Sequence, residues 1–263
     1  MDLGLKGKTA MVAGASKGLG FAVARILASE GSHVSIASRD TTAIQSAKGQ
    51  IEKETGSTVL ACTADVRSAE SVNRWRDDTV REFGGVDMLF VNSGGPPSGT
   101  FLSLDDRAWQ DAVDLLLLSA VRMARSVIPH MKNRGGGSIV FSTSMSVREP
   151  IENLVLSSVV RVAIPGLAKT LAREFATDNI RVNNLIPGRI NTDRLKELDE
   201  FGARKKGITV AEQKKAIVSQ IPLGRYGEPD EYARAAVFVL SPAASYITGA
   251  SLQVDGGMLK GIS

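Results

Sequence analysis

Residues 9–20 read Thr-Ala-Met-Val-Ala-Gly-Ala-Ser-Lys-Gly-Leu-Gly, and this stretch decides the fold. Its first five residues form a short apolar run typical of a buried strand, and the apolar periodicity of residues 19–29 predicts a helix directly after it. Between them, Gly14, Gly18 and Gly20 permit a tight turn whose backbone N–H groups can approach a phosphate at the start of the helix. The stretch therefore predicts the first strand of a parallel sheet followed by a phosphate-binding turn, with a purely structural turn as the alternative.

The same alternation of short apolar runs and longer amphipathic stretches continues along the chain. The predicted strands are Thr9–Ala13, His33–Ser38, Val59–Thr63, Met88–Asn92, Ser138–Ser142, Arg181–Ile186 and Ser251–Val254. The predicted helices are Leu19–Ser29, Thr42–Glu54, Ala69–Phe83, Leu104–Lys132, Ser158–Ala176 and Glu228–Leu240. This alternation predicts one α/β domain over residues 1–263, a Rossmann-type doubly wound sheet of seven mainly parallel strands with helices on both faces.

One segment, residues 191–224, interrupts the alternation just before the last predicted helix. It is rich in charged residues and shows only weak helical patterns. A long insertion at the carboxyl end of a late strand is where a lid over a substrate would sit. We therefore predict a substrate lid here, with a surface excursion that has no role as the alternative.

Composition excludes several classes of protein. The formal net charge of +4 could suggest a nucleic-acid partner, but there is no long run of Lys and Arg, and a mildly basic enzyme is favoured. The single cysteine excludes a disulfide framework, and no Cys/His cluster suggests a metal site. The first residues lack the apolar core of a signal peptide, and no apolar run looks long enough to cross a membrane. We expect a cytoplasmic, soluble protein.

Further short motifs follow the predicted strands in order. They are Asp65-Val66, Asn92-Ser93-Gly94-Gly95, Pro187-Gly188 with Ile190 and Thr192, Ile247-Thr248-Gly249, and Val254-Asp255-Gly256-Gly257. Together with the glycine turn, they make the chain resemble the short-chain dehydrogenase/reductase family over essentially its whole length, and in particular its 3-oxoacyl-acyl-carrier-protein reductase group. The resemblance implies a small-molecule substrate, a bound dinucleotide and a homotetramer. The dinucleotide-binding residues that it implies are Gly14, Ser16, Lys17, Gly18, Leu19, Gly20, Asp65, Val66, Asn92, Ser93, Gly94, Pro187, Gly188, Ile190 and Thr192.

The end of the second predicted strand bears on the choice between NAD and NADP. An NAD-preferring protein places a carboxylate there, which hydrogen-bonds the ribose hydroxyls. This chain has Ser38 followed by Arg39, and Asp40 comes two residues too late. A guanidinium pairs well with a phosphate, and Lys17 in the glycine turn adds a second positive charge. The sequence therefore favours NADP(H) as cofactor.

The catalytic positions that the resemblance implies have mostly changed. In the family a tyrosine protonates the substrate carbonyl, a lysine lowers the pKa of that tyrosine, a serine holds the substrate oxygen and an asparagine supports a water relay. Ser144 matches the serine, although Thr143 and Ser146 could take that role. The other three positions hold Asp114 for the asparagine, Ser157 for the tyrosine and Arg161 for the lysine.

These replacements remove the usual proton donor and leave groups that can stabilise negative charge. A tyrosine has a pKa of about 10 that a nearby cation can lower, whereas an aliphatic hydroxyl is far less acidic. Arginine stays protonated and cannot relay a proton. Ser144 and Arg161 can still donate hydrogen bonds to a developing oxyanion. We expect Asp114 to pair with Arg161 or with a neighbouring cation. Pro165 either frees the carbonyl of Arg161 as an acceptor or only kinks the helix.

Three functions stay open at this point. The first is an NADPH-dependent reductase of an activated carbonyl, such as one conjugated to a double bond, where solvent can supply the proton. The second is ordinary ketone or 3-oxoacyl reduction with water as the proton donor, and the third is an NADPH-binding sensor or partner protein without turnover. Tyr226 is the only plausible replacement tyrosine. Four arginines near the expected site favour an acidic substrate, such as a carboxylate or a carrier-bound thioester, unless they are solvated rim charges: Arg148, Arg161, Arg189 and Arg194.

Overall fold

A computed structural model describes residues 1–261 and confirms the predicted seven-stranded sheet. The strand order is β3-β2-β1-β4-β5-β6-β7, and every pairing is parallel. The strands are β1 (Thr9–Ala13), β2 (His33–Ser38), β3 (Val59–Thr63), β4 (Met88–Val91), β5 (Gly137–Ser142), β6 (Ile180–Pro187) and β7 (Ser251–Val254). Most are buried on both faces, which is why they read as continuous apolar runs in the sequence.

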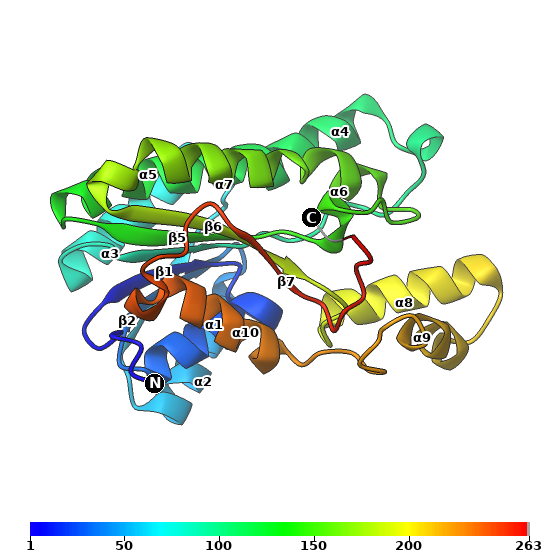
Figure 1. Ribbon diagram of the computed structural model, residues 1–263, viewed down its shortest axis with the longest axis horizontal. Coiled ribbons are helices and arrows are strands. Elements are labelled where there is room, and N and C mark those ends of the chain that lie inside the picture. The colour runs from blue at the N-terminus through cyan, green and yellow to red at the C-terminus, as the bar shows by residue number, and fades with distance from the viewer. Residues whose placement is uncertain (262–263) are drawn as a thin grey trace.

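Helices cover both faces of the sheet (Figure 1). One face carries α1 (Gly18–Ser29), α2 (Thr41–Thr55) and α10 (Pro229–Leu240), and the other carries α3 (Ala69–Phe83), α5 (Ser119–Asn133) and α7 (Ala163–Glu174). Each face has its own cluster of buried apolar side chains. Because all strands of the sheet are parallel, their carboxyl ends lie along the same edge, and the predicted site residues follow the strands there.

The predicted helix 104–132 is divided by a wide turn. It consists of α4 (Asp106–Ala112), the π-helical turn η2 (Val113–Leu118) and α5. A π-helical turn is an uncommon element that often accompanies a functional site, because its extra residue rotates the side chains that follow. Here it contains Asp114, one of the predicted catalytic residues.

The predicted helix 158–176 begins earlier and breaks at Arg161, between α6 (Val155–Val160) and α7. Pro165 lies in the first turn of α7, where a proline is tolerated because its missing N–H has no helical partner. The N–H of Ile164 donates to the carbonyl oxygen of Arg161 at 3.0 Å. That carbonyl is therefore already paired, so the idea of a freed acceptor is wrong and the helix only kinks.

The apolar segment that runs through this break is longer than the sequence pattern predicts. Residues Val155–Glu174 have a mean hydropathy of 1.4 and are, by length and composition alone, able to cross a membrane. In the structure, however, Leu156 and Val160 pack in a small cluster against the 104–117 region, and Ile164 packs in the core beneath α7. A core helix passes the same test, so the segment is weak evidence for a membrane span.

Residues 191–224 form a helical hairpin beyond the carboxyl ends of the strands (Figure 1). Its helices are α8 (Asp193–Lys206) and α9 (Val210–Val218), and a threonine caps the start of each. A small apolar cluster of its own stabilises the hairpin, formed by Leu195, Ile217, Ile221 and Tyr226. The segment is thus a folded unit packed on the rim of the sheet.

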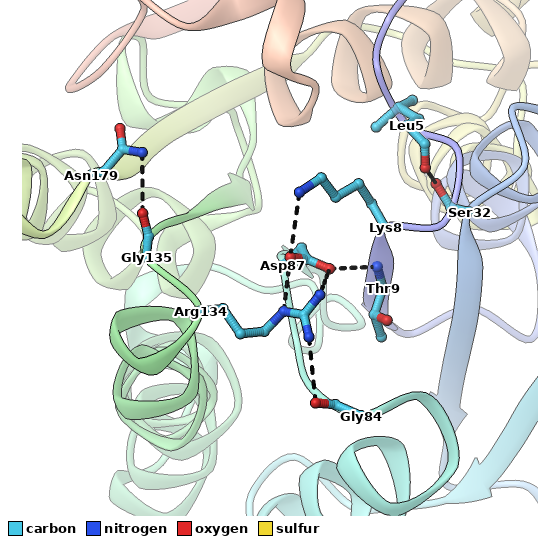
Figure 2. Close-up of polar contacts among 9 residues, drawn as sticks. All are labelled: Leu5, Lys8, Thr9, Ser32, Gly84, Asp87, Arg134, Gly135 and Asn179. Carbon is cyan, nitrogen blue, oxygen red and sulfur yellow. Dashed lines mark hydrogen bonds and ion pairs between the residues drawn. The ribbon is translucent and has the colours of Figure 1, made fainter.

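The opposite, amino-terminal edge of the sheet is fastened by the buried carboxylate of Asp87 (Figure 2). It accepts hydrogen bonds from the backbone N–H of Thr9 at 2.8 Å and from the Arg134 guanidinium at 3.0 and 3.2 Å. Lys8 Nζ lies 3.8 Å away. One side chain thereby joins the starts of β1 and β4 to the end of α5.

Replacing Asp87 with alanine is expected to lower the free energy of unfolding by about 2 kcal/mol, because the buried N–H of Thr9 loses its acceptor and the partly exposed cations Arg134 and Lys8 lose their ion-pair partner. Urea unfolding measures this. Asp77→Ala is the control, since Asp77 is 61% exposed and pairs only with its neighbour Arg76; its expected effect is about 0.5 kcal/mol or less. Equal losses in the two variants would contradict the role given to Asp87.

Candidate active site

The predicted site residues lie along the carboxyl edge of the sheet, on the segments that follow the strands. The predicted cofactor-binding residues follow five strands: Gly14, Ser16, Lys17, Gly18, Leu19 and Gly20 after β1; Arg39 after β2; Asp65 and Val66 after β3; Asn92, Ser93 and Gly94 after β4; Pro187, Gly188, Ile190 and Thr192 at the end of β6. Ser144 follows β5, and α6 carries Ser157 and ends at Arg161. In open α/β sheets this edge is where ligands bind.

Two glycines of the turn, Gly14 and Gly20, have no room for a side chain. Gly14 and Gly18 have φ of +61° and +62°, in the left-handed region that favours glycine. A Cβ on Gly14 would lie 2.8 Å from Asn92 Nδ2, and one on Gly20 would overlap the carbonyl oxygen of Gly14. Asn92 Nδ2 donates to that same carbonyl at 3.3 Å, which fixes the turn against β4. The result is a backbone cradle at the start of α1 that fits a pyrophosphate.

The turn after β6 closes the cradle from the other side. The N–H of Gly188 donates to the carbonyl oxygen of Val254 at 2.9 Å, and a Cβ there would lie 2.7 Å from Asp255 Cβ. Thr192 caps α8 and places its methyl group 3.6 Å from the position that a Cβ on Gly18 would take. The two turns are therefore in close contact, and both ends of a dinucleotide would find backbone close by.

The two cations predicted to bind phosphate, Lys17 and Arg39, differ in whether an acidic side chain already pairs with them. Lys17 Nζ lies 3.3 Å from Asp193 Oδ2, and this hydrogen bond lowers the pKa of Asp193. The sequence alone does not predict this partner, because Asp193 lies in the first turn of α8, far from Lys17 along the chain. Arg39 is exposed, and within residues 1–261 it forms no ion pair. Arg39 is thus free for a phosphate, whereas Lys17 must exchange one partner for another.

The acid predicted to lie near the adenine is already paired within its own loop. Arg67 donates to both carboxylate oxygens of Asp65, at distances from 2.7 to 3.1 Å. The hydrogen bond from Arg67 lowers the pKa of Asp65, so the carboxylate stays ionised and oriented. The backbone N–H of Asp65 remains fixed as well, since it donates to Ser71 Oγ at 3.2 Å.

Three serine hydroxyls form one cluster beside the start of α6. The hydroxyls of Ser146 and Ser157 are 3.0 Å apart and buried. Ser144 Oγ accepts the N–H of Ser146 at 3.2 Å and is only half-buried. Thr143, which could have competed with Ser144, donates instead to Asn184 Oδ1 at 2.8 Å inside the sheet. Ser144 is therefore the accessible hydroxyl, and Ser157 supports it through Ser146.

Arg161 is a buried cation with little to neutralise it. Its side chain is 8% exposed, and Nη2 donates to the carbonyl oxygen of Gly94 at 3.2 Å. No carboxylate in the described chain lies within ion-pair distance of it. Burial, with a smaller contribution from nearby Arg194, lowers the pKa of Arg161 to about 10, so it is still charged at neutral pH. An uncompensated buried charge of this kind is costly and is typical of a functional group.

A second, partly buried guanidinium, that of Arg181, has many more hydrogen-bond acceptors than Arg161. Arg181 on β6 donates to four backbone carbonyl oxygens at 2.8 to 3.1 Å, and three of them belong to the end of α10 and the residue after it. Arginine at a helix C-terminus is a familiar stabilising arrangement. Arg161 has one such acceptor where Arg181 has four.

Asp114 does not reach Arg161. Its carboxylate pairs with Arg122, the neighbouring cation eight residues further on, with Arg122 Nη2 at 3.0 Å from Oδ1. Of the two partners expected for Asp114, the structure therefore selects the neighbouring cation. Asp114 is 43% exposed and η2 packs against α6, so the residue lies at the border of the site rather than inside it.

The remaining arginines and the replacement tyrosine take separate positions. Arg194 on α8 donates to the carbonyl oxygen of Pro96 at 2.9 Å, on the same loop that Arg161 contacts. Arg148 is exposed, and Arg189 points its Nε into a buried region without an acceptor in the described chain. Tyr226 is buried and donates to Asp199 Oδ2 at 3.0 Å, so the suggestion that it replaces the catalytic tyrosine is wrong.

Comparison with known proteins gives consistent matches along the chain. A family model described as Enoyl-(Acyl carrier protein) reductase matches residues 14–259. The chain is 36% identical over 257 residues to Dehydrogenase/reductase SDR family member 4 of Bos taurus, covering 97% of this chain and 88% of that protein. It is 32% identical over 256 residues to 3-oxoacyl-[acyl-carrier-protein] reductase FabG of Vibrio cholerae, covering 97% and 99%. Its fold matches L-sorbose reductase from Gluconobacter frateurii, solved with NADPH and L-sorbose, with a TM-score of 0.94 and 33% identity over all of both chains.

Proposed function

The chain belongs to the short-chain dehydrogenase/reductase family, and we propose that within it the protein is an NADPH-dependent reductase of activated carbonyl compounds, in which the carbonyl is conjugated to a double bond. One observation carries this proposal. Where the family has its tyrosine and lysine, this chain holds a buried, uncompensated guanidinium beside a serine cluster. Such a site stabilises negative charge but has no strong acid to donate.

The cofactor is NADP(H), in agreement with the sequence prediction and with the NADPH complex of the sorbose reductase relative. In this chain the glycine turn would hold the pyrophosphate, because only backbone fits there. Arg39 and Lys17 would hold the 2′-phosphate, and the 187–192 turn would hold the nicotinamide end. When bound, NADPH supplies a hydride to the substrate.

The chain's own groups act on the substrate oxygen. The Ser144 hydroxyl and the Arg161 guanidinium donate hydrogen bonds to that oxygen as it gains negative charge. Because the site is buried, each donor is worth more there than it would be in water. Ser157 holds the cluster in place through Ser146. Hydride addition to the far carbon of the conjugated double bond moves the electron pair onto the carbonyl oxygen and leaves an enolate. Solvent can protonate the enolate later, so no protein acid is required.

Ordinary ketone or 3-oxoacyl reduction, with water as the proton donor, is the second candidate, and the similarity to the FabG relative favours it. A steady-state assay with NADPH and matched pairs of conjugated and saturated ketones separates the two. We expect kcat/KM to be at least about 100-fold higher for the conjugated member, a difference of about 2.7 kcal/mol in the barrier. Equal rates would favour the second candidate, and NADPH binding without turnover of either would favour a sensor.

We also propose that the α8–α9 hairpin is the substrate lid. It contacts the rim of the site at three places. Lys17 in the glycine turn pairs with Asp193, Arg194 contacts the loop after β4, and Lys205 at the far end of α8 hydrogen-bonds the Asn153 side chain. Ion pairs at such exposed positions are weak and can break when a ligand enters.

We propose a homotetramer, located in the cytoplasm, and exposed apolar side chains support the assembly. Val159 and Val162 on the α6–α7 segment are 52% and 54% exposed, and Tyr246 before β7 is fully exposed. Apolar groups of this size at a helix face and beside an edge strand are typical of contacts between subunits. The mass in solution, measured by light scattering, tests this assembly.

Replacing Arg39 with alanine is expected to weaken NADPH binding by about tenfold and to leave NADH binding within about twofold, because a charged hydrogen bond to the 2′-phosphate is lost. Fluorescence titration of the purified protein with each cofactor measures both constants. Arg74→Ala removes an exposed arginine from α3 and serves as the control. An equal loss for NADH and NADPH would show that Arg39 does not read the phosphate.

A further inference from the structure

Arg161 and Arg194 come from distant parts of the chain and meet at one loop. Arg161 Nη2 donates to the carbonyl oxygen of Gly94, and Arg194 Nη2 donates to that of Pro96. Between these two contacts, a Cβ on Gly95 would lie 2.9 Å from both Nε and Nη2 of Arg194. Both guanidiniums thus lie against three consecutive residues, one from the floor of the site and one from the lid.

The charges of the two guanidiniums are poorly balanced. Arg161 has no acidic partner in the part of the chain that the structure describes, and the proximity of Arg194 disfavours its charged form further. Arg194 has one acidic partner, Glu197, at 3.2 Å, which is 58% exposed and sits on the same helix. Two neighbouring cations, one of them buried, repel each other, and an anion bound between them would stabilise both.

A purely structural role for the pair is a poor explanation of this arrangement. Each guanidinium donates to a single carbonyl of the loop, which leaves most of its five N–H donors without a protein acceptor. Arg181 shows that this chain satisfies even a partly buried structural arginine with four carbonyl acceptors. The unused donors of Arg161 and Arg194 are therefore available to a ligand.

We propose that Arg194, together with those N–H donors of Arg161 that do not face the substrate carbonyl oxygen, binds a free carboxylate on the substrate, so that the substrate is an oxo acid. This inference rests on the proposed function, since it names the substrate class of the same site. A carboxylate matches the planar, bidentate geometry of a guanidinium, which a neutral ester or amide does not. Because Arg194 belongs to the lid helix, the bound carboxylate also holds the lid against the loop after β4.

The test uses a conjugated oxo acid and its methyl ester, assayed with NADPH on the full-length protein. We expect the wild type to reduce the acid with a kcat/KM at least about 100-fold above that of the ester. Arg194→Gln is expected to lower the value for the acid by about 30-fold and that for the ester by no more than about threefold. Arg204→Gln, an exposed arginine on the same helix, is the matched control and should change neither.

A second readout does not depend on turnover. A saturated, non-reducible analogue of the acid is titrated into the NADPH complex, with NADPH fluorescence as the signal. The proposal is supported if the wild type binds the analogue and Arg194→Gln binds it about 30-fold more weakly. If that result is obtained but no substrate is turned over, the carboxylate site stands and only the proposed reductase activity is wrong. Equal use of acid and ester overturns the oxo acid and leaves the reductase intact. A comparable loss of NADPH affinity in Arg194→Gln also overturns it, because the pair would then serve the cofactor phosphates.

Discussion

Arg161→Met is expected to lower kcat by about 100- to 1,000-fold, because a preorganised donor to the substrate oxygen is lost. The same change is expected to raise the free energy of unfolding by about 2 kcal/mol. Burial lowers the pKa of Arg161 well below its ordinary value, to about 10, so the unfolded chain holds this proton more tightly than the folded one. At every pH below 10 the buried charge therefore lowers the free energy of unfolding by about 3 kcal/mol, and methionine removes this cost. The hydrogen bond to Gly94, which is lost with the guanidinium, offsets about 1 kcal/mol of that gain in stability.

Arg181→Met is the matched control for this prediction. The substitution is the same and the site is partly buried, but Arg181 donates to four carbonyl oxygens at the end of α10 and beyond. Burial lowers the pKa of Arg181 to about 10 as well, so its charge carries a similar cost. Four lost hydrogen bonds from a charged donor, at about 1.5 kcal/mol each, outweigh that cost, and the variant is expected to destabilise the protein by about 3 kcal/mol. Urea unfolding and steady-state kinetics on both variants measure the contrast. If Arg161→Met destabilised the protein as Arg181→Met does, Arg161 would be a structural residue and the proposed chemistry would lose its basis.

The sheet could be predicted from the sequence because its strands are buried on both faces. A strand such as Thr9–Ala13 has every residue buried, so it appears as an unbroken apolar run between polar turns. Its bounds, like those of His33–Ser38, were predicted correctly for that reason. The glycine turn could also be predicted from the sequence, because a tight turn requires glycine where a side chain would overlap the backbone, as at Gly20.

The partners of charged side chains could not be predicted in the same way. Asp114 and Arg122 are eight residues apart, which in a regular α-helix puts them about 80° apart around the axis. The π-helical turn η2 changes that angle and allows the ion pair, and nothing in its leucine-rich sequence announces a wide turn. Asp199 and Tyr226 meet only because the α8–α9 hairpin folds back on itself.

The predicted catalytic residues show a different limit. The sequence placed Ser144, Ser157 and Arg161 correctly on the segments that follow β5, because the spacing between them is local. The sequence does not predict that Arg161 is buried without an acidic partner, because this depends on which residues face α6 across the site. This environment, rather than the identity of the residue, is what argues for a role in chemistry.

Gly20→Ala is expected to weaken NADPH binding by at least about 100-fold, equivalent to about 2.7 kcal/mol. A Cβ at this position would overlap the carbonyl oxygen of Gly14 and lie 2.9 Å from that of Ala13, both of them backbone atoms. The start of α1 must therefore move away from the turn, and the N–H groups that face the pyrophosphate move with it. Fluorescence titration with NADPH measures the loss. Circular dichroism checks that the variant is folded, and NADPH should no longer raise its Tm.

Gly49→Ala makes the same chemical change where the backbone is free of contacts. Gly49 lies in the exposed middle of α2, and a Cβ there would meet no atom within 4 Å. Alanine is the better helix former, so this variant is expected to be about 0.5–1 kcal/mol more stable than the wild type, with unchanged NADPH affinity. The two glycines differ only in what surrounds them. Unchanged NADPH binding in a folded Gly20→Ala protein would mean that the turn tolerates the displacement, and the pyrophosphate would then have to bind elsewhere on the carboxyl edge.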